Sequence, residues 1–160
     1  MNTQASEFVG SIPDHYDRSL GPRIFSGFAK DLAARVANTA SSSVLELAAG
    51  TGILTRHLRD LLPASSELIA TDLNAPMLNA AKVKFEDGEK VRFEVADATQ
   101  VQYENESFEG IVCQFGVMFF PDKVQSFKEA HRVLKPGGHY HFNVWGSWDN
   151  NPFARITHDV

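Results

Sequence analysis

Hydrophobic and polar residues recur along the chain with two different periods, which together predict strands separated by helices. Short apolar or alternating runs predict strands at residues 43–48, 67–71, 91–95, 108–114 and 139–145. Apolar residues at helical spacing predict helices at about residues 22–38, 52–62, 74–84 and 122–134. A regular succession of strands and helices is typical of an α/β domain.

Proline, glycine and capping residues mark the ends of several predicted helices. Pro22 falls near the first position of the first helix, and Pro63 follows the end of the second. Asn74 is expected to cap the start of the third helix. The fourth helix is expected to stop at the Pro-Gly-Gly turn of residues 136–138. These signals agree with the boundaries that the hydrophobic pattern gives.

The order of the elements predicts how they are arranged in space. Strands that alternate with helices are joined by right-handed crossovers, so we expect a parallel sheet within a three-layer α/β/α sandwich. Ligands of such sheets bind beyond the carboxyl ends of the strands, near the point where the strand order reverses. Glu46, Asp72, Asp97 and Gln114 each fall at or just past the end of a predicted strand. They are therefore the first candidates for a binding site.

The composition narrows the class of protein and of partner. A length of 160 residues with 43% hydrophobic residues fits one domain, and a net charge of −5 predicts no nucleic-acid partner. The single cysteine, Cys113, lies in an apolar run and is expected to be buried, so a cytoplasmic location is expected. The polar N-terminus does not resemble a signal peptide, and no run of about 20 apolar residues predicts a membrane span.

The segment from Val44 to Gly52 carries the clearest chemical signal. An apolar strand reaches Glu46, and a turn of small residues follows it, with expected ligand contacts from Ala48, Gly50, Thr51 and Gly52. A strand, a tight turn and a helix N-terminus in this order predict a nucleotide-binding cradle. The carboxylate of Glu46 beneath the turn would repel a pyrophosphate and favour a cationic group. S-adenosylmethionine (SAM), which carries an ammonium and a sulfonium, is the expected ligand.

Several ordered motifs resemble those of a known family. They are Glu-Leu-Ala-Ala-Gly-Thr-Gly at 46–52, Thr-Asp-Leu-Asn at 71–74, Ala-Asp-Ala at 96–98 and Arg-Val-Leu-Lys-Pro-Gly-Gly at 132–138. From about Tyr16 to Trp145 the chain resembles the class I (Rossmann-like) SAM-dependent methyltransferases, of the small-molecule type that includes quinone-biosynthesis C-methyltransferases. Ala48 stands where this family usually has its first glycine. The resemblance implies a Rossmann-like sheet and methyl transfer to a small-molecule acceptor.

The resemblance also implies roles for residues beyond the glycine turn. Asp72 would accept hydrogen bonds from the ribose hydroxyls, and Leu73 would lie along the adenine face. Asp97 would accept a bond from the adenine amine, and Ala98 would supply a backbone amide. Both aspartates have a structural alternative, because Asp72 can start the next helix and Asp97 can cap a short helix.

The loop after the fourth strand and the N-terminal arm hold the remaining candidates. Gln114 is expected to bind the acceptor or the amino-acid tail of SAM, through its side chain or its backbone. Phe115, Phe119 and Phe120 are candidates for the wall of the pocket, and a place in the core is the favoured alternative for Phe119 and Phe120. Tyr16 resembles part of a lid that would add cation–π attraction to the sulfonium, with a solvent-exposed arm as the alternative.

Methyl transfer from SAM is an in-line displacement with a good leaving group, so no catalytic dyad is required. The spacing shows none, and no catalytic residue is assigned. His139 and His141 share one strand face without a third ligand, so no metal site is expected. The alternatives are a nicotinamide (NAD)-dependent oxidoreductase, for which Thr55 would take the third glycine position, and a non-catalytic SAM-binding module or fragment.

The organisation along the chain completes these expectations. Residues 1–20 are expected to form an N-terminal arm or lid, and residues 21–160 the SAM-binding domain. Members of the family normally continue beyond the fifth strand, whereas this sequence stops at Val160, so we expect a sheet truncated after the fifth strand. The exposed edge of that strand predicts either a fragment of a longer protein or a homodimer formed through the edge.

Overall fold

Parallel strands form one sheet in a computed structural model that describes residues 24–40, 42–147 and 151. The sheet has five strands in the order β3-β2-β1-β4-β5, and they are β1 (Ser43–Glu46), β2 (Glu67–Asp72), β3 (Val91–Val95), β4 (Phe108–Gln114) and β5 (Leu134–Asn143). Each strand runs parallel to its neighbours. The predicted parallel sheet is confirmed, and its strand order reverses between β1 and β4.

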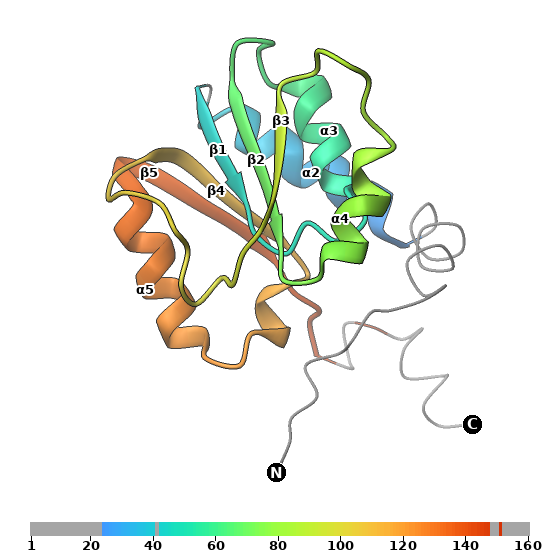
Figure 1. The fold of residues 1–160 in the computed structure, drawn as a ribbon. Helices are drawn as coiled ribbons and strands as arrows, with labels where there is room; N and C mark the ends of the chain where they lie inside the picture. The colour runs from blue at the N-terminus through green and yellow to red at the C-terminus, as the bar shows by residue number, and fades with distance from the viewer. Residues whose placement is uncertain (1–23, 41, 148–150, 152–160) are drawn as a thin grey trace, which may run out of the picture.

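Helices cover both faces of this sheet (Figure 1). α2 (Ser26–Ala37), α3 (Ile53–Leu61) and α4 (Ala75–Lys82) lie on one face, and α5 (Lys123–Val133) lies on the other. A short 3₁₀ helix, η2 (Val117–Phe119), follows β4. The three layers agree with the predicted sandwich. Within the described ranges, no helix has the length and hydrophobicity that crossing a membrane requires.

Alternating side chains of the central strand β1 divide the hydrophobic core into two parts. Val44 packs with buried residues of α2 and α3, whereas Leu45 packs with Ala130 and Val133 of α5. Both β1 residues are fully buried, as is typical of a parallel strand between two helical layers. Because strand side chains alternate with a period of two, Glu46 lies on the same face as Val44, toward α3.

The last strand begins earlier than the sequence predicts. Leu134 directly follows α5 and pairs with Phe108, so residues 136–138 lie within β5 and do not form a separate turn. The register of the β4–β5 pair shifts at this point and absorbs the extra residues. A Cβ on Gly138 would lie 2.9 Å from the carbonyl oxygen of Glu109, so the close approach of the two strands requires a glycine.

Two predicted helix starts have different outcomes. Asp122 caps α5, because its Oδ1 accepts a 2.9 Å hydrogen bond from the backbone amide of Gln125. Asn74 occupies the N-cap position of α4, but its side chain makes no capping bond and donates to Asp72 at 3.3 Å. The predicted cap is therefore wrong for the Asn74 side chain, since the neighbouring carboxylate takes its amide.

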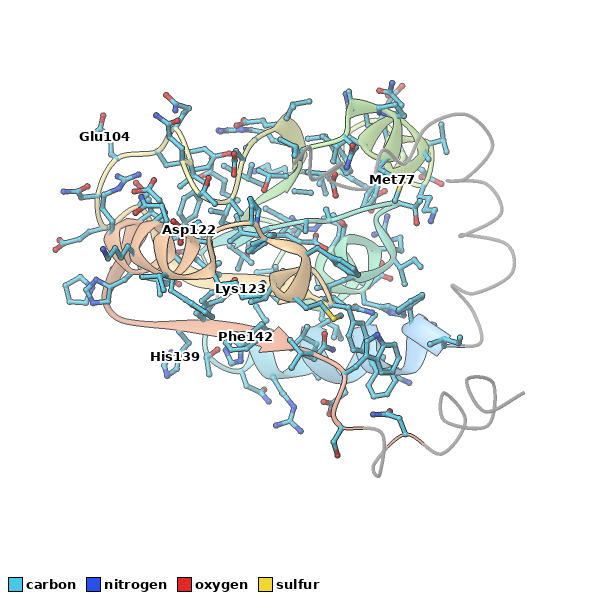
Figure 2. All side chains as sticks on the ribbon, turned by 90° about the horizontal axis from the view of Figure 1, so that it is seen from below. Met77, Glu104, Asp122, Lys123, His139 and Phe142 are labelled. Atoms are coloured by element: carbon cyan, nitrogen blue, oxygen red, sulfur yellow. The ribbon has the colours of Figure 1, made fainter. Side chains whose placement is uncertain are left out.

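β5 forms one edge of the described sheet, where it pairs with β4 alone among the described strands. This position agrees with the edge that the sequence predicts for the fifth strand. Phe142 of β5 (Figure 2) is 43% exposed, and its ring lies 5.7 Å from that of Phe127 on α5. Aromatic surface therefore continues from the edge strand onto the neighbouring helix.

Candidate functional site

A cavity of about 1050 Å³ opens beyond the carboxyl ends of β1, β2, β3 and β4. Met77 of α4 (Figure 2) forms part of its wall. The cavity lies where the strand order reverses, which is the position expected for a ligand in such a sheet. Most predicted cofactor contacts meet on its wall, namely Glu46, Ala48, Gly50, Thr51, Asp72, Leu73, Asp97, Ala98 and Gln114. Tyr16 and the rest of the predicted arm lie outside the described residues.

The turn after β1 has the backbone that its small residues predict. Ala48, Gly50 and Gly52 have φ angles of 53°, 58° and 79°, in the left-handed region that favours glycine. Ala48 adopts this conformation without being glycine, so the departure from the family pattern is accommodated with local strain. The amide of Ala49 donates to the carbonyl oxygen of Thr71 at 2.8 Å, which extends the β1–β2 pairing into the turn.

Gly52 serves the packing of two helices and does not line the cavity. It occupies the N-cap position of α3, and a Cβ there would lie only 2.8 Å from the Cβ of Ala81 on α4. The glycine thus allows the start of α3 to approach α4 closely. Its predicted direct contact with a cofactor remains a prediction.

Asp72 ties the end of β2 to the glycine turn. Its Oδ2 accepts a 2.9 Å bond from the amide of Gly50, and its Oδ1 accepts a 2.8 Å bond from the amide of Asn74. The structural and ligand-binding interpretations are therefore compatible, because a carboxylate offers about four acceptor positions. The side chain is buried at the cavity wall with part of this capacity still available.

Glu46 is the most deeply buried carboxyl group of the cavity wall. The residue is 1% exposed, and its Oε2 has no hydrogen-bond partner among the described residues. Burial raises the pKa of this carboxyl to about 8, and the negative charge of Asp72 acts in the same direction. A cationic ligand group in the cavity would give Glu46 the partner that the described residues do not supply. The carboxyl groups of this wall therefore fit the ammonium of a SAM-type ligand.

Asp97 lies at the outer wall of the cavity and organises the turn after β3. Its Oδ1 accepts bonds from the amide and the hydroxyl of Thr99, at 2.8 and 2.7 Å. The structural alternative for Asp97 is the cap of a short helix, and the structure has a turn at residues 98–99 in place of a helix; the exposed carboxylate keeps acceptor capacity. Ala98 packs against the core on the α5 side of the sheet, and Leu73 is 56% exposed at the rim. All three stand where a ligand can reach them.

Gln114 connects the end of β4 to the beginning of the described chain at the cavity wall. Its Nε2 donates a 3.0 Å bond to the carbonyl oxygen of Phe25, while its buried Oε1 has no partner among the described residues. The next residue, Phe115, has a φ of 53°, and its amide donates a 2.9 Å bond to Oδ1 of Asn143. This strained backbone brings the Phe115 ring onto Trp145, with ring centres 4.3 Å apart.

Aromatic residues contribute more of the cavity wall than the sequence analysis predicts. Phe119 is 68% exposed and lines the cavity, so its predicted place in the core is wrong. Phe120 lines the cavity and also packs against the core. Phe25 and Trp145 join the wall from segments that no motif marks. Contacts between residues so distant in the sequence are not visible in a local pattern.

The loops after β1 and β4 meet at one tight contact. A Cβ on Gly116 would lie 2.5 Å from the Cβ of Ala48 and 2.7 Å from Sγ of Cys113. Cys113 is buried as predicted, and burial raises the pKa of its thiol to about 12. The two loops that flank the reversal point are thus fitted to each other, and residue 116 has no room for a side chain.

The histidines of β5 form a pair outside the cavity. The rings of His139 and His141 lie 5.9 Å apart, and Nε2 of His141 lies 2.8 Å from the hydroxyl of Thr39. In the part of the chain that the structure describes, no group of three or more metal-ligating side chains occurs. Because this histidine pair lies outside the cavity, it contributes no side chain to the cavity wall.

Known proteins resemble this chain in sequence. Residues 44–138 match the family described as the methyltransferase domain. The ubiquinone/menaquinone biosynthesis C-methyltransferase of Hahella chejuensis is 35% identical over 124 residues, which are 76% of this chain and 49% of the relative. The demethylmenaquinone methyltransferase of Deinococcus radiodurans is 34% identical over 138 residues, 82% of this chain and 56% of the relative. The chain thus spans about half the length of these curated relatives.

Solved structures share the fold. A putative SAM-dependent methyltransferase from Methanococcus maripaludis superposes with a TM-score of 0.75 at 19% identity, covering 99% of this chain and 75% of its own. The putative methyltransferase in complex with the Trm112 activator from Haloferax volcanii gives a TM-score of 0.72 at 23% identity, covering 82% and 57%. At these identities the likeness concerns the fold, and the family assignment rests on the sequence match. The chain belongs to the SAM-dependent methyltransferase family.

Proposed function

We propose that this chain binds SAM in the cavity and forms the cofactor-binding part of a methyltransferase that acts on a small molecule. The observation that carries the proposal is the buried carboxyl of Glu46, whose Oε2 has no hydrogen-bond partner among the described residues, beside Asp72 at the ends of β1 and β2. A site with two acidic groups and a glycine turn favours a nucleoside with a cationic tail. The NAD-dependent alternative is not retained, because the match to the methyltransferase domain and the carboxyl groups of Glu46 and Asp72 in the cavity wall both oppose it.

Each wall residue then has a defined role. Asp72 accepts bonds from the ribose hydroxyls, and Leu73 covers the adenine face at the rim. Asp97 and the backbone of Ala98 hold the adenine amine and ring edge. Glu46 faces the ammonium, with the turn at Ala48, Gly50 and Thr51 against the tail. The described geometry supports these roles, since all of these residues line one cavity.

When bound, SAM supplies a methyl group on a positively charged sulfur, which is a good leaving group. The contribution of the chain is to orient the acceptor and to exclude water. Aromatic surface lines the cavity beyond the carboxyl ends of β4 and β5, contributed by Phe115, Phe119, Phe120 and Trp145. A wall of this kind suits an apolar acceptor. We infer that the acceptor is a flat aromatic compound of the quinone type, methylated on carbon, as the names of the two relatives indicate for those proteins.

Calorimetry with three ligands tests this proposal. SAM and S-adenosylhomocysteine are expected to bind with micromolar affinity, and NAD is expected to give no heat of binding at the same concentrations. Binding of NAD without binding of either SAM-type ligand would overturn it. A methyl-transfer assay with a demethylated quinol then separates an enzyme from a non-catalytic SAM-binding module, the alternative that the half-length match to the relatives keeps open.

We further propose that β5, the edge strand of the described sheet, pairs with a second copy of the chain, and that the protein acts in the cytoplasm. The edge position of β5 and the exposed ring of Phe142 support the pairing, because unpaired strand edges associate readily. Sedimentation at several protein concentrations is expected to show a dimer. Introducing a charge by Phe142→Lys is expected to shift the dimer toward monomer, and a wild-type monomer at all concentrations would contradict the pairing.

A further inference from the structure

The floor of the cavity holds a carboxyl group in surroundings that favour its neutral form. Glu46 is buried to 1% exposure, and its Oε2 receives no hydrogen bond from the described residues. An ionised carboxylate in such a position is strongly disfavoured unless a cation or strong donors face it. The geometry thus disfavours an anion at this place before a ligand arrives.

Among the described groups that face Glu46, Asp72 strengthens this preference and the hydroxyl of Thr55 opposes it. On β2 the neighbour is Asp72, a second carboxyl in the same cavity wall, and on β4 it is Cys113, whose buried thiol is neutral. From α3 the neighbour is the hydroxyl of Thr55. The buried cation of α3, Arg59, is engaged elsewhere, because it donates to the carbonyl oxygens of Ser66 and Lys90 where β2 and β3 begin. Glu46 lies at the opposite end of the sheet.

We propose that Glu46 carries a proton in the ligand-free protein and releases it to solvent when the ammonium of the cofactor enters the cavity. The O–H bond of the carboxyl breaks, the proton leaves to solvent, and the resulting carboxylate pairs with the ammonium, which keeps its own protons. Cofactor binding is thereby coupled to the release of about one proton. This inference rests on the proposed function, since it requires a ligand that carries an ammonium group.

The raised pKa of Glu46 sets the range in which the release is measurable. With a pKa of about 8 before binding, about 0.9 proton is released at pH 7.0 and about 0.1 at pH 9.0. The ordinary pKa of a glutamate would give no release at either pH. The affinity for the ligand is expected to rise by about tenfold per pH unit between pH 6 and 7, and to level off above pH 8.

Titration calorimetry of the whole chain with S-adenosylhomocysteine tests this coupling. The observed enthalpy at pH 7.0 is compared in buffers with small and large ionisation enthalpies, phosphate and Tris, and the slope gives the number of protons released. The same slope is measured for 5′-methylthioadenosine, which keeps the nucleoside and sulfur but lacks the ammonium, and for the Glu46→Gln variant. A release near 0.9 proton is expected for wild type with S-adenosylhomocysteine, and a value near zero for both controls.

The outcomes separate this inference from the proposed function. Binding of S-adenosylhomocysteine with no buffer dependence overturns the proton release and leaves the proposed function standing. An equal release by Glu46→Gln, or with 5′-methylthioadenosine, assigns the proton to another group and also overturns it. Failure of both SAM and S-adenosylhomocysteine to bind overturns the two proposals together. If Glu46→Gln does not fold, the wild-type pH series and the 5′-methylthioadenosine control decide the question.

Discussion

The backbone amide of Gly50 donates a 2.9 Å hydrogen bond to Oδ2 of Asp72, so the glycine turn after β1 is held by the residue that ends β2. A single carboxylate thereby fixes the shape of the turn and faces the cavity that the turn encloses. Its second oxygen accepts the amide of Asn74 at the start of α4. Loss of this carboxylate is expected to affect stability and ligand affinity together.

The Asp72→Asn variant tests this double role. An asparagine keeps the size of the side chain but removes the charge and one acceptor, so one of the two amides loses its partner. We expect S-adenosylhomocysteine to bind about 10- to 100-fold more weakly, which corresponds to about 1.4 to 2.8 kcal/mol. Calorimetry measures the affinity, and Asp122→Asn serves as the control because Asp122 caps α5 and is not part of the cavity wall. An unchanged affinity in Asp72→Asn would contradict the role.

Gly52→Ala is expected to destabilise the protein through two separate effects. The new Cβ has to adopt a φ of 79° and would lie 2.8 Å from the Cβ of Ala81, so strain and overlap add to about 2–4 kcal/mol. Gly88→Ala isolates the first effect, because Gly88 has a φ of 96° with no atom within 4 Å of its added Cβ. Urea unfolding is expected to show a loss of only about 1–2 kcal/mol there.

A double variant sharpens the test at this helix contact. Ala81→Gly removes the atom that the new Cβ would meet, so Gly52→Ala is expected to cost less stability in the Ala81→Gly background than in wild type. Equal losses in Gly52→Ala with and without Ala81→Gly would show that overlap is not the cause.

The buried guanidinium of Arg59 is expected to be essential for stability. It donates to the carbonyl oxygens of Leu62, Ser66 and Lys90, so Arg59→Met removes one hydrogen bond from each of these acceptors. We expect a loss of about 3 kcal/mol in the free energy of unfolding. Arg35→Met is the matched control, because the Arg35–Asp31 pair is exposed and is expected to contribute little to the free energy of unfolding. Similar losses in the two variants would refute the prediction.

The raised pKa of Glu46 predicts how the stability of the ligand-free protein depends on pH. The folded state holds this proton more tightly than the unfolded state, so the Glu46 contribution is fully present below about pH 4.5. It is lost progressively as the pH rises from there through about 8. The melting temperature is therefore expected to fall between pH 5 and pH 8. In Glu46→Gln this fall should be much smaller, and an identical fall in the variant would assign the effect to another group.

The fold follows from the sequence because its signals are local and mutually consistent. Apolar runs such as 108–114 and caps such as Asp122 act within a few residues. The spacing of hydrophobic residues therefore predicts where each strand and helix lies. The start of β5 was misplaced because Pro136 and Gly137 normally end regular structure, whereas here the register shift of β4 accommodates them. That accommodation depends on a neighbouring strand, which a local pattern does not contain.

The candidate site is predicted in part for the same reason. Glu46, Asp72 and Asp97 follow strands, and the carboxyl ends of parallel strands meet at one edge, so topology alone brings them to one cavity. Phe25 and Trp145 reach the cavity through contacts between distant segments, and Phe119 is exposed there although it lies in an apolar run. Burial of an aromatic residue depends on the tertiary fold, so hydrophobicity gave the wrong location.

The contact between Gly116 and Ala48 links the mutational histories of two distant positions. Because an added Cβ at residue 116 would lie 2.5 Å from the Cβ of Ala48, each position limits the size of the other. Glycine at 48, the usual residue of this family, would remove only one of the two overlaps of an alanine at 116, because Sγ of Cys113 lies 2.7 Å from the same point. Related sequences are therefore expected to change residue 116 only together with both residue 48 and residue 113.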